Sequence, residues 1–374
     1  MGDKSDENLK IAKLTLDGYC NYGNVLQNYA LQEVLKKYGE VDCLWHSKDN
    51  FMPRVWYKMG WKDIVKIILN WRGLRHSIFS DYHGMEMIRQ GKIKEWCDRY
   101  INIRCVGNKI IQTVSAYDFF VVGSDQVWNP YNNKVEDFFL FFVPPEKRIA
   151  YAASISCPEL PSDKVLLYKK GFTEMAHISL REQHGADIVK KLIGRDVPVL
   201  VDPTLLLSPD DWRKVSRQPV WYHGKDYILT YFLGERPEVV AHLEQETGLK
   251  VVNLLDKDVY ENYVTGPDEF IWAIEHAKLV YTDSFHGTVF SILFRTPFVV
   301  CNRIGNEVES KMGSRIDTLL GYFGLECRRG TRANNYTISN PFDEPDWLMV
   351  DEVLERERQR ANDYLCEALG LKQH

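Results

Sequence analysis

"LVYTDSFHGTVFSILF", residues 279–294, carries one apolar run into a second through a short polar turn. The first run is short and rich in β-branched and aromatic residues, which indicates a buried strand. Asp283 and Ser284 are both good N-cap residues, so the second run predicts a helix with His286 in its first turn. A strand that leads directly into a helix is the unit from which α/β folds are built.

The same alternation recurs toward the N-terminus, and a helical pattern closes the chain. Because 374 residues are too many for one ordinary core, two domains are expected. We therefore predict an α/β protein with two doubly wound domains that face a cleft. The predicted division is an N-terminal domain over 1–170, a C-terminal domain over 171–340 that includes a strand near 176–181, and a helix within 341–374, its apolar stripe formed by Leu348, Val353, Leu354 and Leu365.

Composition narrows the class of protein. The net charge is −5 and the pI about 6.1, whereas nucleic-acid binders are usually basic. The eight cysteines form no CxxC pair, which argues against a zinc site or a disulfide framework and favours a reducing compartment. The polar N-terminus is no signal peptide, and no apolar run is long enough to span a bilayer. We expect a cytoplasmic protein with no metal and no nucleic-acid partner.

Two predicted strand ends are rich in neutral amides, which suit sugar hydroxyls. The first stretch, 18–32, carries Asn21, Asn24, Gln27 and Asn28, although an N-capped helix after a tight turn explains it equally well. The second stretch, "GSDQVWN" at 123–129, combines amides, a carboxylate and an aromatic ring; the alternative is an Asp-capped helix start with a packing tryptophan. Its candidate binding residues are Ser124, Asp125, Gln126, Trp128 and Asn129.

Two further strand ends carry positive groups. Arg181 sits where a strand yields to a helix and is suited to a carboxylate or phosphate, although a salt bridge is the simpler explanation. His286 lies at a predicted helix N-terminus, where a bound anion favours imidazolium. A lone histidine is more often structural, so the residues alone leave its role open.

Taken together, these stretches resemble the polysaccharide pyruvyl transferase family. The matching features are "NYGNVLQNYALQ" near the start, "VVGSDQVWN", "SLRE" followed by "VLVDPTLLL", "TDSFHGTVFSILFRTPFV" and "SKMGSRIDTLLGYFGL". The resemblance implies a GT-B-like fold and phosphoenolpyruvate as co-substrate, with no cofactor. It also implies that a cyclic pyruvate ketal forms on two hydroxyls of one sugar and that phosphate is released.

The resemblance also assigns residues. The family's donor site carries an arginine that matches Arg181 and an Arg-x-His pair that matches 284–286, where this chain has Ser284 in place of the arginine. We expect the missing charge to come from Arg303, Lys311 or Arg315. Ser284 and the N–H groups near Gly287 would take phosphate oxygens. His286 would protonate the donor's methylene carbon and Asp125 would orient or deprotonate the acceptor hydroxyl, with the donor on the C-terminal domain and the sugar on the N-terminal one.

Residues 51–79 are locally basic, with tryptophan and aliphatic residues at helical spacing. One interpretation is an interfacial helix that contacts the inner face of the cell membrane, where a polyprenyl-diphosphate-linked sugar of a capsular or surface polysaccharide would be the acceptor. The other is a helix packed on the N-terminal sheet with a solvated basic face.

Two other functions stay open from the sequence. One is a GT-B glycosyltransferase that uses a nucleotide sugar, although neither a P-loop nor a Rossmann fingerprint is present. The other is a non-catalytic carbohydrate-binding relative, since the family arginine at position 284 is absent.

Overall fold

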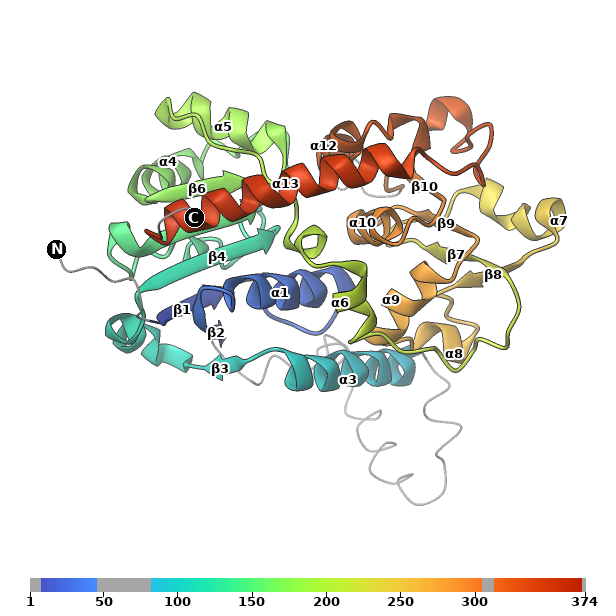
Figure 1. Cartoon of the computed structure of the whole chain (residues 1–374), viewed down its shortest axis with the longest axis horizontal. Coiled ribbons are helices and arrows are strands. Elements are labelled where there is room, and N and C mark those ends of the chain that lie inside the picture. The colour runs from blue at the N-terminus through green and yellow to red at the C-terminus, as the bar shows by residue number, and fades with distance from the viewer. Residues whose placement is uncertain (1–7, 46–81, 305–312, 372–374) are drawn as a thin grey trace, which may run out of the picture.

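The computed structural model describes residues 8–45, 82–304 and 313–371. These residues form two parallel sheets with helices packed on them, side by side along the long axis of the molecule (Figure 1). The first sheet has the order β3-β2-β1-β4-β5-β6. Its strands are β1 (Leu9–Leu14), β2 (Gly39–Trp45), β3 (Ile103–Cys105), β4 (Phe119–Asp125), β5 (Arg148–Ala153) and β6 (His177–Leu180).

The second sheet has the order β11-β10-β9-β7-β8. Its strands are β7 (Tyr227–Tyr231), β8 (Lys250–Asn253), β9 (Leu279–Thr282), β10 (Phe298–Cys301) and β11 (Arg329–Gly330). In each sheet the strand order reverses once, next to β1 in the first and next to β7 in the second. The predicted fold class is confirmed: the chain forms two Rossmann-like α/β domains and ends in a long C-terminal helix.

Helices connect the strands and cover the sheets (Figure 1). Strands β4 and β5 are buried along almost their whole length, as expected where helices cover both faces of a parallel sheet. The helices are α1 (Tyr22–Leu35), α3 (Tyr82–Tyr100), α4 (Val165–Glu174), α5 (Gln183–Ile193), α6 (Pro209–Arg213), α7 (Leu243–Thr247), α8 (Tyr260–Tyr263), α9 (Pro267–Glu275), α10 (Phe285–Leu293), α12 (Ser314–Phe323) and α13 (Trp347–Ala368).

The predicted boundary at residue 170 is wrong for the strand that follows it. β6 pairs in parallel with β5, so it is the edge of the first sheet and not part of the second. Ile178 and Leu180 complete the apolar core of the first domain. The chain then continues along the same edge, where Val199 bridges to Leu180. Parallel strands of both domains carry the same apolar pattern, which is why the sequence did not assign this one.

Helix α13 crosses from the second domain to the first and packs on both (Figure 1). Tyr364 donates to the carbonyl of Ala150 in β5 at 2.7 Å. Leu354 and Leu365 lie on its buried face, as predicted, but Leu348 is 75% exposed and lies outside the apolar stripe. The buried face consists of Trp347, Val350, Leu354, Glu357, Ala361, Leu365 and Ala368.

Direct contacts also join the two domains. Lys92 of α3 pairs with Glu269 of α9 at 2.9 Å, and the Tyr263 hydroxyl donates to Glu86 at 2.7 Å.

The segment 51–79 lies outside the described residues, so the membrane prediction stays a prediction. Among the residues that are described, no helix combines the length and apolar character needed to cross a bilayer.

Candidate active site

A pocket of about 720 Å³ opens between the domains, where the loops after β1 and β4 meet those after β7 and β9. These are the carboxyl ends of the strands beside each reversal of strand order, where ligands of open α/β sheets bind. The pocket is lined by Leu16, Asp17, Gly18, Cys20, Asn21, Asn24, Asp125, Gln126, Asn129, Tyr131, Asn132, Asn133, Lys134, Phe138, Leu233, Ser284, Phe285, His286, Arg303 and Arg315.

The amides after β1 divide between the pocket and the core. Asn21 is the N-cap of α1 and accepts from the Gly23 N–H at 2.8 Å, and both Asn21 and Asn24 line the pocket. Gln27 and Asn28, in contrast, are buried inside the first domain. Gln27 donates to Thr15 at 2.9 Å, and Asn28 receives the ammonium of Lys13. The prediction that Gln27 and Asn28 contact the acceptor is therefore wrong, because one helical face is turned toward the sheet.

The loop after β4 places Asp125 in the pocket wall with a left-handed backbone, φ +64°. Gln126 and Asn129 line the same pocket, and their contact with the acceptor stays a prediction. Trp128 does not: its ring is fully buried and stacks on Phe139 at 5.5 Å between ring centres. Its predicted sugar contact is thus replaced by a core position.

His286 lies in the first turn of α10, as the opening stretch predicted, and is 6% exposed at the pocket wall. Ser284 is the N-cap, and its hydroxyl accepts from the Gly287 N–H at 3.2 Å. That N–H is already used, so Gly287 is a poor candidate for the predicted phosphate contact. The N-termini of α1 and α10 both point toward this pocket and contribute positive potential there.

Arg181 lies behind the pocket wall, not in it. Its guanidinium is buried between Asp202, at 2.7 Å, and Asp125, at 3.4 Å. It also covers the ring of Phe285 at 4.4 Å from the centroid. Arg181 and His286 come together, although they belong to different sheets. The predicted direct grip of Arg181 on the donor is wrong in this geometry, because two carboxylates already hold its charge.

Asp202 is the residue that sequence reasoning missed. Its side chain is fully buried and receives the Ser124 hydroxyl at 2.8 Å, so Ser124 supports this carboxylate instead of lining the pocket. His286 Nε2 lies 3.6 Å from Asp202 Oδ2. Burial alone would raise the pKa of the Asp202 carboxyl, but His286 and Arg181 hold it well below its usual range. The one available signal was its place in the "VLVDPTLLL" motif.

Arg315 is the buried cation of the pocket that lacks a carboxylate. Among the described residues, none of its contacts is an ion pair, and the Gln126 amide oxygen, when turned toward it, accepts from Nη1 at 3.0 Å. Burial and the neighbouring Arg181 lower the pKa of Arg315 to about 10. Arg303 also lines the pocket and lies 3.6 Å from Asp283. Lys311 falls outside the described residues.

The opposite rim belongs to the first domain. Tyr131 is 63% exposed there, beside the amides of Asn132 and Asn133, and Lys134 pairs with Asp17 at 3.1 Å. None of these residues was singled out from the sequence. The run "NPYNNK" that carries them reads as a loop, and only the fold brings it to the pocket.

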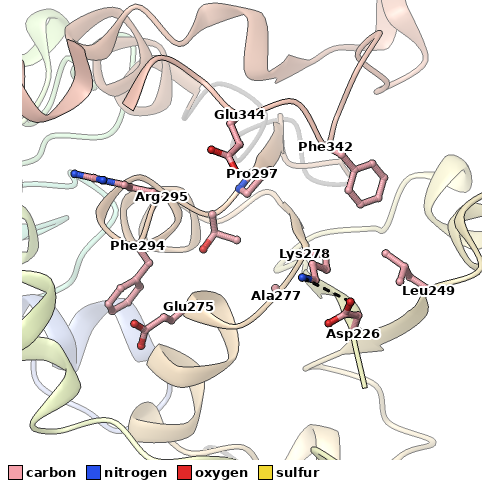
Figure 2. Close-up of a pocket in the computed structure, with 11 residues that line it drawn as sticks. Asp226, Leu249, Glu275, Ala277, Lys278, Phe294, Arg295, Pro297, Phe342 and Glu344 are labelled. Carbon is pink, nitrogen blue, oxygen red and sulfur yellow. Dashed lines mark ion pairs between the residues drawn. The ribbon is translucent and has the colours of Figure 1, made fainter. Parts of the chain in front are cut away.

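A second pocket of about 450 Å³ lies at the opposite, amino ends of the second sheet (Figure 2). In Figure 2, Lys278 and Asp226 pair beside Leu249, at a separation of 3.6 Å. Three carboxylates and two cations line it, and no buried unpaired cation faces it within the described part of the chain. The chemistry therefore gathers in the first pocket.

The sequence profile of the family described as polysaccharide pyruvyl transferase matches residues 21–304. The chain belongs to the polysaccharide pyruvyl transferase family. The matched region runs from the N-cap of α1 to just beyond Arg303, and it contains Asp125, Asp202 and His286. Arg315, which forms no ion pair with any described residue, lies outside it.

Solved structures with a similar outline have low sequence identity to this chain. A UDP-N-acetylglucosamine 2-epimerase covers 99% of this chain and 98% of its own, with 10% identity and a TM-score of 0.47. The Anabaena protein HepE, in complex with UDP and glucose, covers 96% and 100%, with 11% identity and a TM-score of 0.46. Likenesses this weak say nothing about the chemistry of this chain. No curated protein matches its sequence.

Proposed function

We propose that this protein transfers pyruvate from phosphoenolpyruvate to two hydroxyls of one sugar and so forms a cyclic ketal. The observation that carries the proposal is the buried Arg315, a cation without a carboxylate partner among the described residues, facing the same pocket as His286. A site that keeps a buried cation unpaired is suited to a ligand that brings the negative charge.

The donor fits the end of the pocket formed by the second domain. Phosphoenolpyruvate carries a carboxylate and a phosphate, and Arg303 and Arg315 supply two guanidinium groups there. The α10 N-terminus adds its dipole beside Ser284. These groups stand in for the arginine that the family pattern places at position 284. Lys311 remains a further candidate from the sequence.

The reaction needs a proton donor and a proton acceptor. His286 gives a proton to the methylene carbon of the donor, which becomes a methyl group, and positive character develops at the neighbouring carbon. The first sugar hydroxyl adds to that carbon while Asp125 takes its proton, and the phosphate leaves with the electrons of the C–O bond. The second hydroxyl closes the ring and returns a proton to His286. Asp125 then passes its proton to the released phosphate. Of the two hydroxyl protons, one therefore replaces the proton that His286 gave to the methyl group, and the other ends on phosphate.

The acceptor fits the rim formed by the first domain. Asn21, Asn24 and Asn129 offer neutral hydrogen-bonding groups, and Tyr131 offers an exposed ring on which a sugar face can pack. We extend the proposal to an acceptor that is linked to a polyprenyl diphosphate. This extension rests only on the composition of residues 51–79.

The test is a screen of the purified chain with phosphoenolpyruvate and a panel of free and lipid-linked oligosaccharides. We expect acceptor-dependent phosphate release, with a mass gain of one pyruvate less one water on the acceptor. His286→Gln should lower the rate about 10²- to 10⁴-fold. Thermal stabilisation by nucleotide sugars and not by phosphoenolpyruvate would instead support the glycosyltransferase. A lack of turnover, with sugar binding retained, would support the non-catalytic relative.

A further inference from the structure

We propose that Asp202 is a positioning residue for His286: it holds the imidazole at Nε2 and leaves Nδ1 as the nitrogen that delivers the proton. This inference rests on the proposed function for its catalytic meaning. Its structural content, which nitrogen faces which partner, stands independently.

The two ring nitrogens of His286 have different surroundings. Nε2 is buried and lies 3.6 Å from Asp202 Oδ2, and within the described residues it has no other polar partner. Nδ1 lies on the side of α1, where a Cβ built on Gly23 would be only 2.0 Å away. The turn at that point carries Asn21 and Asn24, which line the pocket. Only Nε2 of this ring is a buried atom without a hydrogen-bond partner, which leaves Nδ1 as the nitrogen assigned to the pocket side.

Asp202 itself is held rigidly. It accepts from Arg181 Nη1 at 2.7 Å, from Ser124 Oγ at 2.8 Å and from the Thr204 hydroxyl at 2.7 Å. A carboxylate fixed in this way fixes the ring that it contacts, since a histidine's tautomer is set by the partner of its other nitrogen. A shift of about 0.5 Å brings Nε2 within hydrogen-bond distance, and such contacts often tighten when substrate binds.

The pairing also joins the two domains. Asp202 follows the edge of the first sheet, whereas His286 begins a helix of the second. The proton donor is thus oriented only when the domains are docked. Other charged groups also bear on this site: Arg181 lies behind it, and the residues that face the same pocket are Asp17, Asp125, Lys134, Arg303 and Arg315.

The first test needs no substrate. The measurement is a ¹⁵N NMR spectrum of the full chain, in which the His286 signals are identified among the ten histidines by their loss in His286→Gln. In the neutral form, His286 should carry its proton on Nε2. In Asp202→Asn this preference should weaken, because the carboxylate that favours a proton on Nε2 is lost. Asp211→Asn, in the capping box of α6, is the control and should leave both signals unchanged.

The second test is kinetic. Asp202→Asn should lower kcat at least tenfold and displace the pH profile of the rate, while Asp202→Glu restores part of the rate. A neutral wild-type ring protonated on Nδ1, or an unchanged tautomer preference in a folded Asp202→Asn, would overturn the proposal. If the NMR result holds but the wild type releases no phosphate, the pairing stands and the proposed function fails.

Discussion

Gly23 of α1 lies directly against the imidazole of His286, so closely that a Cβ on Gly23 would be 2.0 Å from His286 Nδ1. The two residues belong to different domains and meet at the pocket wall. No side chain fits between them, because 2.0 Å is far inside the contact distance of carbon and nitrogen. The absence of a side chain at position 23 is therefore what lets His286 approach the first domain.

Replacing Gly23 with alanine should disturb this approach. Alanine is the better helix former, so a free position in a helix gains up to about 1 kcal/mol from the change. At position 23 the clash should displace His286 or part the domains, and kcat/KM for pyruvyl transfer should fall at least tenfold. Two measurements check this: the rate of phosphate release and the midpoint of urea unfolding.

Gly91 of α3 is the matched control, because a Cβ there would meet nothing within 4 Å. Gly91→Ala should leave the rate unchanged and stabilise the protein slightly. If Gly23→Ala behaves like Gly91→Ala in both measurements, the contact with His286 has no functional role.

Arg315→Gln should weaken the binding of the donor and leave the binding of the acceptor unchanged. A hydrogen bond to a charged group is worth about 1.5–3 kcal/mol, so the KM for phosphoenolpyruvate should rise about ten- to hundredfold. The free energy of unfolding should not fall, because the cation is buried beside Arg181 without an anion of its own among the described residues. Initial rates at varied donor concentration measure the first effect and urea titration the second.

Arg213→Gln serves as the comparison for Arg315. Arg213 is exposed on α6 and pairs with Glu275 and Asp210, away from the pocket. It should leave the donor KM unchanged. An Arg315→Gln enzyme with a normal donor KM would show that Arg315 does not bind the donor.

Lys13 should make the protein less stable at neutral than at alkaline pH. It is fully buried in β1, and burial lowers its pKa to about 8 from an ordinary value of 10.5. Between these two values the unfolded chain holds a proton that the folded chain lacks, so stability falls as pH drops from 10.5 to 8. The loss is about 3 kcal/mol and persists at lower pH.

Lys13→Met should remove this dependence of stability on pH. It should also raise the free energy of unfolding at pH 7, by an amount reduced by the loss of the hydrogen bonds to Asn28. Urea titrations of wild type and variant at pH 7 and pH 10 measure the difference. Lys94→Met, on the surface of α3, should change stability by no more than about 0.5 kcal/mol. If the difference between Lys13→Met and wild type is the same at both pH values, the buried lysine is not the cause.

Substitutions of Tyr131 should affect acceptor binding, whereas substitutions of Trp128 should affect stability. Tyr131→Ala should raise the acceptor KM about five- to tenfold, with an unchanged donor KM, because an aromatic contact worth about 1 kcal/mol is lost. Trp128→Ala should cost about 3–5 kcal/mol of stability, because it opens a cavity beside Phe139 and Phe172. Trp128→Phe, which keeps most of the packing, should leave the acceptor KM unchanged. An acceptor KM that responds to Trp128→Phe and not to Tyr131→Ala would reverse the assignment.

The sequence by itself determined the local units of this protein. The strand, the Ser284 cap and the helix that carries His286 all follow from short-range preferences, and so does the Asn21 cap of α1. Alternating units of this kind also fixed the fold class, because parallel strands joined by helices have few ways to bury their apolar faces.

Only the tertiary structure decided which polar side chains reach the pocket. Asn24 and Asn28 lie one turn apart on α1, yet Asn24 lines the pocket and Asn28 binds a buried lysine in the sheet. Asp202 meets His286 only because β6 joins the first sheet and the second domain packs against that edge. Neighbours distant in sequence set these environments, and no pattern along a single stretch contains that information.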